Sequence, residues 1–373
     1  MPPPQARSPW MIGPAWDLAA MAFGWLPFYV WLVAGLGLGA EVFGGPRLAG
    51  AAAEQATALA VVVALAITYV HRHYTFLVVY GDREVLSQRA RAYWLAPALV
   101  VALLAFARAT ADVAPATIAG VKLSPWQVAL LVTGAWNIWH TLQQRYGLLR
   151  IYAGKLGGAV AEPEQARRDR ALLWLSAATV AVALPVTRPE LLSGHINARK
   201  LGRAVAPIAD SWGAWLLLAA LLSALGYTLF RWLRREFAAP EPLSRRAPRL
   251  ALMGSTLLLL AIFLVHGPVI GYLCFGTAHA VEYVAFVHHY GVRKFAHPER
   301  RGVAAALLRD ARKAVPVLVG GFLLLFWLLR DQRRTDVYLV YYTATSWLHF
   351  LYDGWIWKVR KPELQRTLAI AGR

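Results

Sequence analysis

Long apolar stretches alternate along the chain with short segments rich in Lys and Arg. A helix of about 20 residues crosses the roughly 30 Å hydrocarbon core of a bilayer. The pattern therefore predicts an all-α polytopic integral membrane bundle of about ten transmembrane helices. The ten stretches cover about residues 15–38, 53–72, 93–110, 126–147, 171–186, 211–230, 250–266, 269–289, 314–330 and 337–357.

Two breaks in this pattern shape the expected organisation of the chain. Only Gly267 and Pro268 separate the seventh stretch from the eighth. Because Pro ends a helix and Gly tolerates unusual backbone angles, we expect a tight helical hairpin there. The polar, Pro-containing segment 238–248 predicts a loop that could act as a hinge between helices 1–6 and 7–10. We otherwise expect residues 1–373 to form a single membrane domain.

Composition agrees with a membrane protein. The chain is 58% hydrophobic and 16% charged, whereas soluble domains are about 45–50% apolar and about 25% charged. This balance excludes an ordinary cytosolic enzyme and a disordered chain. The single cysteine, Cys274, excludes an intrachain disulfide and a metal cage of thiolates. A metal site in this chain has to be built from His and carboxylates.

The basic residues predict an orientation. If the N-terminus and the ends of the even-numbered helices face one side, that side holds 29 of the 39 Lys and Arg. Cytoplasmic loops concentrate these residues, so we expect both termini in the cytoplasm, and a bacterial inner (plasma) membrane as the location. The net charge of +19 is explained in this way without a nucleic-acid partner.

Histidines provide the candidate chemistry. Seven of the ten lie on even-numbered predicted helices, which places them near the cytoplasmic side. Ionisable residues inside a membrane are costly and usually mark a functional site. These seven are the candidate metal ligands His71, His73, His140, His279, His288, His289 and His349.

Helical spacing adds two carboxylates to the candidates. His279 and Glu282 are three residues apart, and His349 and Asp353 are four apart, so each pair shares a helix face. Glu282 and Asp353 are therefore candidate metal ligands and candidate catalytic groups. His288 and His289 point about 100° apart, so one of them at most faces the same centre as His279.

We expect the primary ligands to be His73, His140, His279, His289 and His349. The second choices are His71, His288 and Gln144. Imidazole with carboxylate suits Fe(II), and also Zn(II) as a lesser alternative.

At these clusters the chain resembles histidine-rich integral membrane non-haem iron oxygenases. These are the fatty-acyl desaturase and hydroxylase superfamily and, more loosely, the bacterial carotene-cleaving dioxygenases. The matching pieces are His71-Arg72-His73, His140 with Gln144, His279-Ala-Val-Glu282, His288-His289 and His349 with Asp353. The spaced histidine boxes of desaturases do not occur in this chain.

The resemblance implies a function and its partners. It implies one or two non-haem irons, O2 as co-substrate and a hydrophobic, lipid-like substrate that enters from the bilayer. A soluble electron donor at the cytoplasmic face is a further expected partner. The reaction would be a hydroxylation, a desaturation or an oxidative cleavage.

Two other function classes stay open at the level of sequence. A polytopic transporter could use the histidines and carboxylates as proton or cation sites, and the break at Gly267-Pro268 is a feature that carriers share. A haem electron carrier with two axial histidines is the third interpretation. Metal content and the visible spectrum separate the three.

Overall fold

A computed structural model describes residues 8–112, 116–118, 121–157, 161–192, 206, 209–238, 241–297 and 299–370. Within these ranges the fold is all-α apart from one short antiparallel hairpin, which pairs Ala116 with Leu123. Its strands are β1 (Ala116–Ile118) and β2 (Val121–Leu123). The long helices are α3 (Gly50–Gly81), α5 (Ala90–Ala109), α6 (Pro125–Leu156), α8 (Pro163–Thr187), α10 (Trp212–Ala238), α11 (Leu243–Lys294), α13 (Ala311–Leu328) and α14 (Asp336–Ile356).

Short helical segments connect or extend the long helices. The short α-helices are α1 (Pro14–Trp16), α2 (Leu26–Val30), α4 (Arg83–Gln88), α12 (Val303–Leu308) and α15 (Pro362–Thr367). The π-helices are η1 (Asp17–Ala22) and η2 (Trp31–Gly35). The 3-10 helices are η3 (Ala40–Phe43), η4 (Pro189–Leu192) and η5 (Arg330–Gln332).

The protein is membrane-embedded, as its apolar helices indicate. Six helices, α3, α5, α8, α10, α11 and α13, are long and apolar enough to cross a bilayer. A bent pair, Pro14–Ala22 with Leu26–Gly35, raises the number to seven if it counts as one span. In α3 and in α10, only 11% of an apolar stretch of 18 residues is buried inside the protein. Apolar side chains left exposed to that extent are suited to lipid rather than to water.

All ten predicted stretches fall on helical segments, but a count of ten spans stays a prediction. The first stretch is broken by a turn between η1 and α2, and the seventh and eighth both lie in α11. The fourth and tenth lie in α6 and α14, which are not among the six apolar helices. Both carry polar side chains within their length, including His140 and Asp353. The sidedness of the termini also stays a prediction.

The chain divides into two compact units that are interleaved in sequence. Unit 1 comprises Met1–Val61, Thr141–Ala278 and Leu368–Arg373, and unit 2 comprises Val62–His140 and His279–Thr367. The chain passes between the units within α3, α6 and α11, and again directly after α15 (Pro362–Thr367). The expected hinge segment 238–248 lies inside unit 1, and α11 begins within it at Leu243. Residues 239 and 240 of that segment lie outside the described residues.

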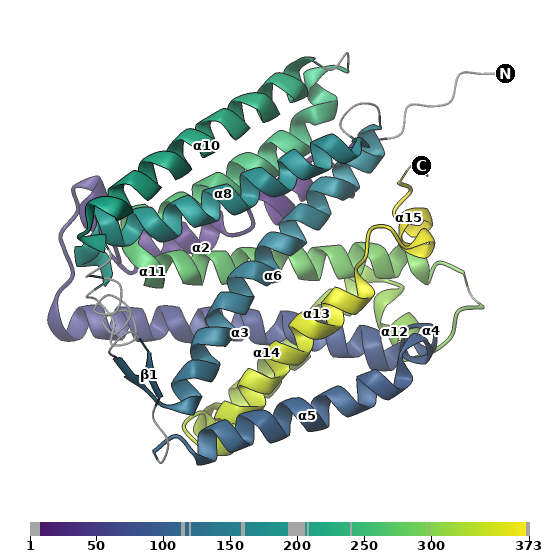
Figure 1. The fold of residues 1–373 in the computed structure, drawn as a ribbon. Coiled ribbons are helices and arrows are strands. Elements are labelled where there is room, and N and C mark those ends of the chain that lie inside the picture. The colour runs from purple at the N-terminus through teal and green to yellow at the C-terminus, as the bar shows by residue number, and fades with distance from the viewer. Residues whose placement is uncertain are drawn as a thin grey trace. The chain divides into compact units, whose positions relative to one another are not determined.

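Unit 1 is held together by a buried ion-pair cluster as well as by apolar packing. Helices α8 and α10 lie side by side (Figure 1). The guanidinium of Arg249 on α11 is 2.7 Å from Asp169 of α8 and 2.6 Å from Glu236 of α10. Trp232 donates to Asp169 at 2.8 Å, and Arg150 pairs with the same carboxylate at 3.0 Å. Every charge in this cluster therefore has a partner, which is what burial of charged groups requires.

Helix α11 turns sharply where the sequence predicts a break. Gly267 has a φ of 83°, in the left-handed region that favours glycine. The ring of Phe263 lies 6.0 Å from that of Phe275, although twelve residues of straight helix span about 18 Å. A Cβ at Gly271 would come within 2.5 Å of the Phe263 ring, so the two arms touch at this glycine.

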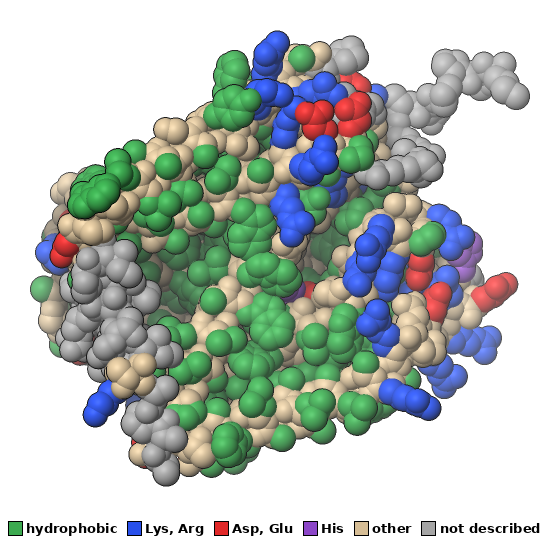
Figure 2. Space-filling view, in the orientation of Figure 1, with side chains coloured by type: hydrophobic (Ala, Val, Ile, Leu, Met, Phe, Trp, Pro, Cys, Tyr) green, Lys and Arg blue, Asp and Glu red, His purple; other side chains and the backbone are tan. Residues whose placement is uncertain are grey.

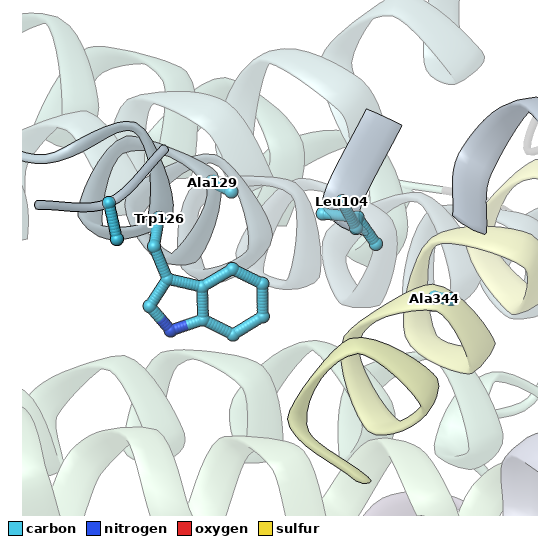
Figure 3. Packing of buried hydrophobic residues seen from close by; sticks show 5 residues of the cluster. Leu104, Trp126, Ala129 and Ala344 are labelled. Atoms are coloured by element: carbon cyan, nitrogen blue, oxygen red, sulfur yellow. The ribbon is translucent and has the colours of Figure 1, made fainter. Parts of the chain in front are cut away.

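In unit 2, α5 packs along α14 (Figure 1). Figure 3 shows four members of its apolar core, Leu104 of α5, Trp126 and Ala129 of α6, and Ala344 of α14. The end of this unit that carries α4, α12 and α15 gathers Lys and Arg, whereas α5 shows mainly hydrophobic side chains along its length (Figure 2). This is the distribution that a helix bundle with one basic membrane face would have.

Candidate metal centre

Four helix segments of unit 2 bring four histidines together. His71 comes from α3, His140 from α6, His279 from α11 and His349 from α14. All four are buried, with exposed fractions of 0–6%. Asp353 joins them from α14, one turn after His349, and is 5% exposed. A polar cluster of this size in an apolar bundle is costly unless its members satisfy one another or bind a ligand.

The Nε2 atoms of three histidines converge. Nε2 of His349 lies 3.2 Å from Nε2 of His71 and 3.2 Å from Nε2 of His279. Two nitrogens that bind one ion at about 2.1 Å are about 3.0 Å apart at a right angle and about 3.4 Å apart in a tetrahedron. The observed separations therefore match those of ligands on a common metal.

His140 and Asp353 form a second group that shares His349. Nε2 of His140 lies 3.5 Å from Oδ2 of Asp353 and makes no hydrogen bond of normal geometry with any described residue. Oδ2 is also 3.6 Å from Nδ1 of His349. The His140 ring lies 4.9 Å from the rings of both His279 and His349, so it borders the three converging histidines.

Hydroxyl groups determine which nitrogen of His349 is available. Thr75 Oγ1 lies 2.7 Å from Nδ1 of His349, 2.7 Å from the Tyr283 hydroxyl and 3.0 Å from Oδ1 of Asp353. Tyr283 also donates to Oδ1 at 2.8 Å. A buried carboxylate needs donors, so we assign the single hydroxyl proton of Thr75 to Asp353. Nδ1–H of His349 then donates to Thr75, and Nε2 carries the lone pair.

Hydrogen bonds between the imidazoles cannot account for the cluster. With its proton on Nδ1, Nε2 of His349 has one lone pair and can accept one hydrogen bond of good geometry. Two imidazole nitrogens nevertheless lie 3.2 Å from it. A cation at the centre would satisfy all three Nε2 atoms at once. The residues present therefore fit a metal ion.

Two predicted ligands lie elsewhere. His73 faces away from His71, because residues two positions apart on a helix point in directions that differ by about 200°. Its Nδ1–H donates to the Tyr69 carbonyl at 2.7 Å, and its Nε2 accepts from the Tyr341 hydroxyl at 2.9 Å. His288 contacts the Tyr74 hydroxyl at 2.8 Å through Nε2. The structure thus brings His71, our second choice, into the cluster in place of His73.

The remaining candidates are also outside the two ligand groups. Glu282 is buried at 1% exposure, and His289 is partly exposed. Neither belongs to a set of described His, Cys, Asp or Glu whose ligand atoms gather within 4.8 Å. In contrast, Thr75 and Tyr283 belong to the cluster although the sequence interpretation did not include them. Each follows a cluster histidine by four residues, the spacing that also relates Asp353 to His349.

Comparisons of the chain with protein-family models, with curated proteins and with solved structures gave no significant match. The geometry of the cluster is therefore the basis of the functional argument.

Proposed function

We propose that this protein is an integral membrane metalloenzyme, a non-haem iron oxidoreductase that uses O2 to hydroxylate, desaturate or cleave a lipid-like substrate. The observation that carries the proposal is the convergence of the Nε2 atoms of His71 and His279 on that of His349, at 3.2 Å each. Iron bound by imidazoles supplies the activation of O2 for such reactions.

The geometry favours one metal ion rather than two. The two ligand groups share His349, and its Nδ1 contacts Thr75 at 2.7 Å. Only Nε2 of His349 is then available as a ligand. We therefore assign the metal to His71, His279 and His349, with His140 as a fourth imidazole beside them.

The other residues of the cluster orient the ligands and balance charge. Asp353 places a negative charge next to His140 and His349, which offsets the positive charge of a bound cation. Thr75 and Tyr283 fix this carboxylate through Oδ1, so Oδ2 stays directed at the imidazoles. Trp357 in turn donates to the Tyr283 hydroxyl at 3.1 Å. A substrate that reaches these buried side chains would leave bulk water behind, which suits an apolar molecule.

Metal content of single variants tests the assignment. We expect His279→Ala to lose most of the iron that the detergent-purified wild-type protein binds, because one of three converging ligands is removed. His288→Ala is the matched control, since His288 is also a buried histidine on α11 but contacts Tyr74. Its iron content should equal that of the wild type. Equal iron in His279→Ala and the wild type would remove His279 from the site.

One structural observation supports the transporter hypothesis, namely the break of α11 at Gly267. Discontinuous helices line substrate sites in many carriers. Gly267 lies in unit 1, whereas the histidine cluster, including His279 on the same helix α11, belongs to unit 2. The metalloenzyme accounts for the cluster, so we keep transport as the alternative that a metal-free protein would favour.

A further inference from the structure

Arg72 carries a buried positive charge that no described carboxylate neutralises. Its side chain is 2% exposed, and it lies within α3, one of the helices apolar enough to span a membrane. Its three hydrogen-bond acceptors among the described residues are neutral: the Thr68 carbonyl at 3.0 Å, the Tyr342 carbonyl at 2.9 Å and the Ser346 hydroxyl. A buried charge without an opposite charge nearby is unfavourable in a low-dielectric interior, so a counter-ion is expected.

The unused donors of this site point to an anion. Nη2 of Arg72 has no hydrogen-bond partner among the described residues, and neither has the hydroxyl of Tyr338, which is 7% exposed. The Arg72 guanidinium lies 3.8 Å from the centre of the Tyr342 ring, and that ring is 6.0 Å from the ring of Tyr338. The Tyr342 ring is thus a neighbour of both side chains that carry an unsatisfied donor.

The number of donors selects the kind of anion. Nη2 offers two N–H groups and Tyr338 one O–H, which together match the two oxygens of a carboxylate. A phosphate would bring more oxygens and up to two charges into a site with a single cation. Arg72 lies within α3, which is apolar enough to span a membrane, so we expect the rest of the ligand to be apolar.

The position of Arg72 relates this site to the metal centre. Arg72 follows His71 in the chain, and its partner Ser346 precedes His349 by three residues on α14. Residues three apart lie on the same face of a helix, less than one turn from each other. A carboxylate held at Arg72 would therefore bind within about one helical turn of His71 and of His349.

We propose that Arg72, assisted by Tyr338, binds the carboxylate of a long-chain apolar acid. The further assignment of this acid as the substrate of the metal centre rests on the proposed function. The binding of the acid is independent of that function, because it depends on Arg72 and Tyr338 and on none of the cluster histidines.

Binding of palmitate to the detergent-purified full chain tests the proposal, with methyl palmitate as the neutral analogue. We expect the wild type to bind palmitate and to discriminate strongly against the ester. Arg72→Gln should weaken palmitate binding roughly ten- to hundredfold, the range of a charge-assisted hydrogen bond. Tyr338→Phe, which removes one hydroxyl, should give a smaller loss and covers the case in which Arg72→Gln does not fold.

Arg108→Gln is the matched control, because Arg108 pairs with Asp336 at 2.8 Å and is partly exposed. It should bind palmitate as the wild type does. Equal affinity for palmitate and its methyl ester, or unchanged palmitate binding in both Arg72→Gln and Tyr338→Phe, would overturn the proposal. Displacement of palmitate by equimolar acetate would overturn the requirement for an apolar chain.

Iron content measured on the same samples separates this proposal from the proposed function. Arg72→Gln should retain its iron while it loses palmitate. Arg72-dependent palmitate binding by a protein that cannot bind iron would uphold the acid site and refute its assignment as a substrate site.

Discussion

Thr75 determines, at the scale of single residues, which nitrogen of His349 faces the other imidazoles. Its hydroxyl is 2.7 Å from Nδ1 of His349 and donates to Asp353 at 3.0 Å. Partners of this kind fix the tautomer and the ring orientation of metal-binding histidines. A residue that binds no metal can in this way control whether a metal binds.

Replacement of Thr75 by Val should therefore weaken iron binding by about 10- to 100-fold, the usual effect of losing such a partner. Val has nearly the same shape but cannot accept the Nδ1–H of His349. Thr75→Ser keeps the hydroxyl and should retain iron with near wild-type affinity. Titration of apo-protein with Fe(II) measures both affinities. Equal affinities in the Val and Ser variants would show that the hydroxyl does not orient His349.

Residue spacing could predict part of the site but not all of it. The pair His349 and Asp353 was recognisable because four residues make one helical turn, and the structure places both in the cluster. The same spacing relates His71 to Thr75 and His279 to Tyr283, yet a hydroxyl residue in an apolar helix is too common to single out. Between His71 and His73, sequence cannot decide which one faces the bundle, because that depends on the rotation of α3.

At the scale of elements, the turn in α11 depends on Gly267. Its φ of 83° is unfavourable for other residues, and a Cβ there would lie 3.2 Å from that of Leu191. Gly and Pro together predicted this break from sequence, because their backbone preferences are local. The rotation and contacts of the two arms depend on packing partners such as Phe263 and Gly271, which local preferences do not specify.

We expect Gly267→Ala to destabilise the protein by about 1–2 kcal/mol, the cost of a left-handed residue with a Cβ. Thermal unfolding in detergent should show a lower Tm. Gly254→Ala is the control, since Gly254 lies in the same helix with open space around it. It should leave Tm unchanged or raise it slightly. A Gly267→Ala variant as stable as the wild type would mean that the turn does not need this backbone angle.

Ion pairs join short elements at the basic end of unit 2. Lys294 at the end of α11 lies 2.8 Å from Asp82, 2.6 Å from Glu363 of α15 and 3.3 Å from Glu84 of α4. Arg300 pairs with Glu84 at 2.8 Å. Partial burial opposes ionisation of Glu84, but Lys294 and Arg300 outweigh it and lower the pKa of this carboxyl.

A group whose pKa is lowered by folding stabilises the protein above its unfolded pKa, and this contribution is lost as the pH falls through the folded pKa. Glu84→Gln should therefore lower the Tm at pH 7, with a difference from wild type that shrinks below about pH 4. The effect should be modest, because Glu84 is half exposed. Glu299→Gln serves as control, as Glu299 is exposed and forms no ion pair with the described residues. A constant difference across this pH range would exclude the ion pairs as its cause.

At the scale of the whole molecule, composition and apolar stretches were sufficient to predict a membrane-embedded all-α fold. Helices α6 and α14 fall outside the set of strongly apolar helices because they carry side chains such as His140 and Asp353. The sequence could not predict that the chain divides into two interleaved units, with every residue of the histidine cluster in unit 2. Such a division arises from long-range packing, and no local pattern encodes it.

The content of iron in the purified wild-type protein, read together with its visible spectrum, tests the central claim most directly. After purification without chelators, or after reconstitution with Fe(II), we predict about one iron per chain, since His349 has only Nε2 available as a ligand. We also predict no Soret band, because the proposed iron is not held in haem. Two irons per chain would contradict the single-ion assignment, and a Soret band would indicate haem. A protein that stays metal-free after reconstitution would contradict the metalloenzyme and favour transport.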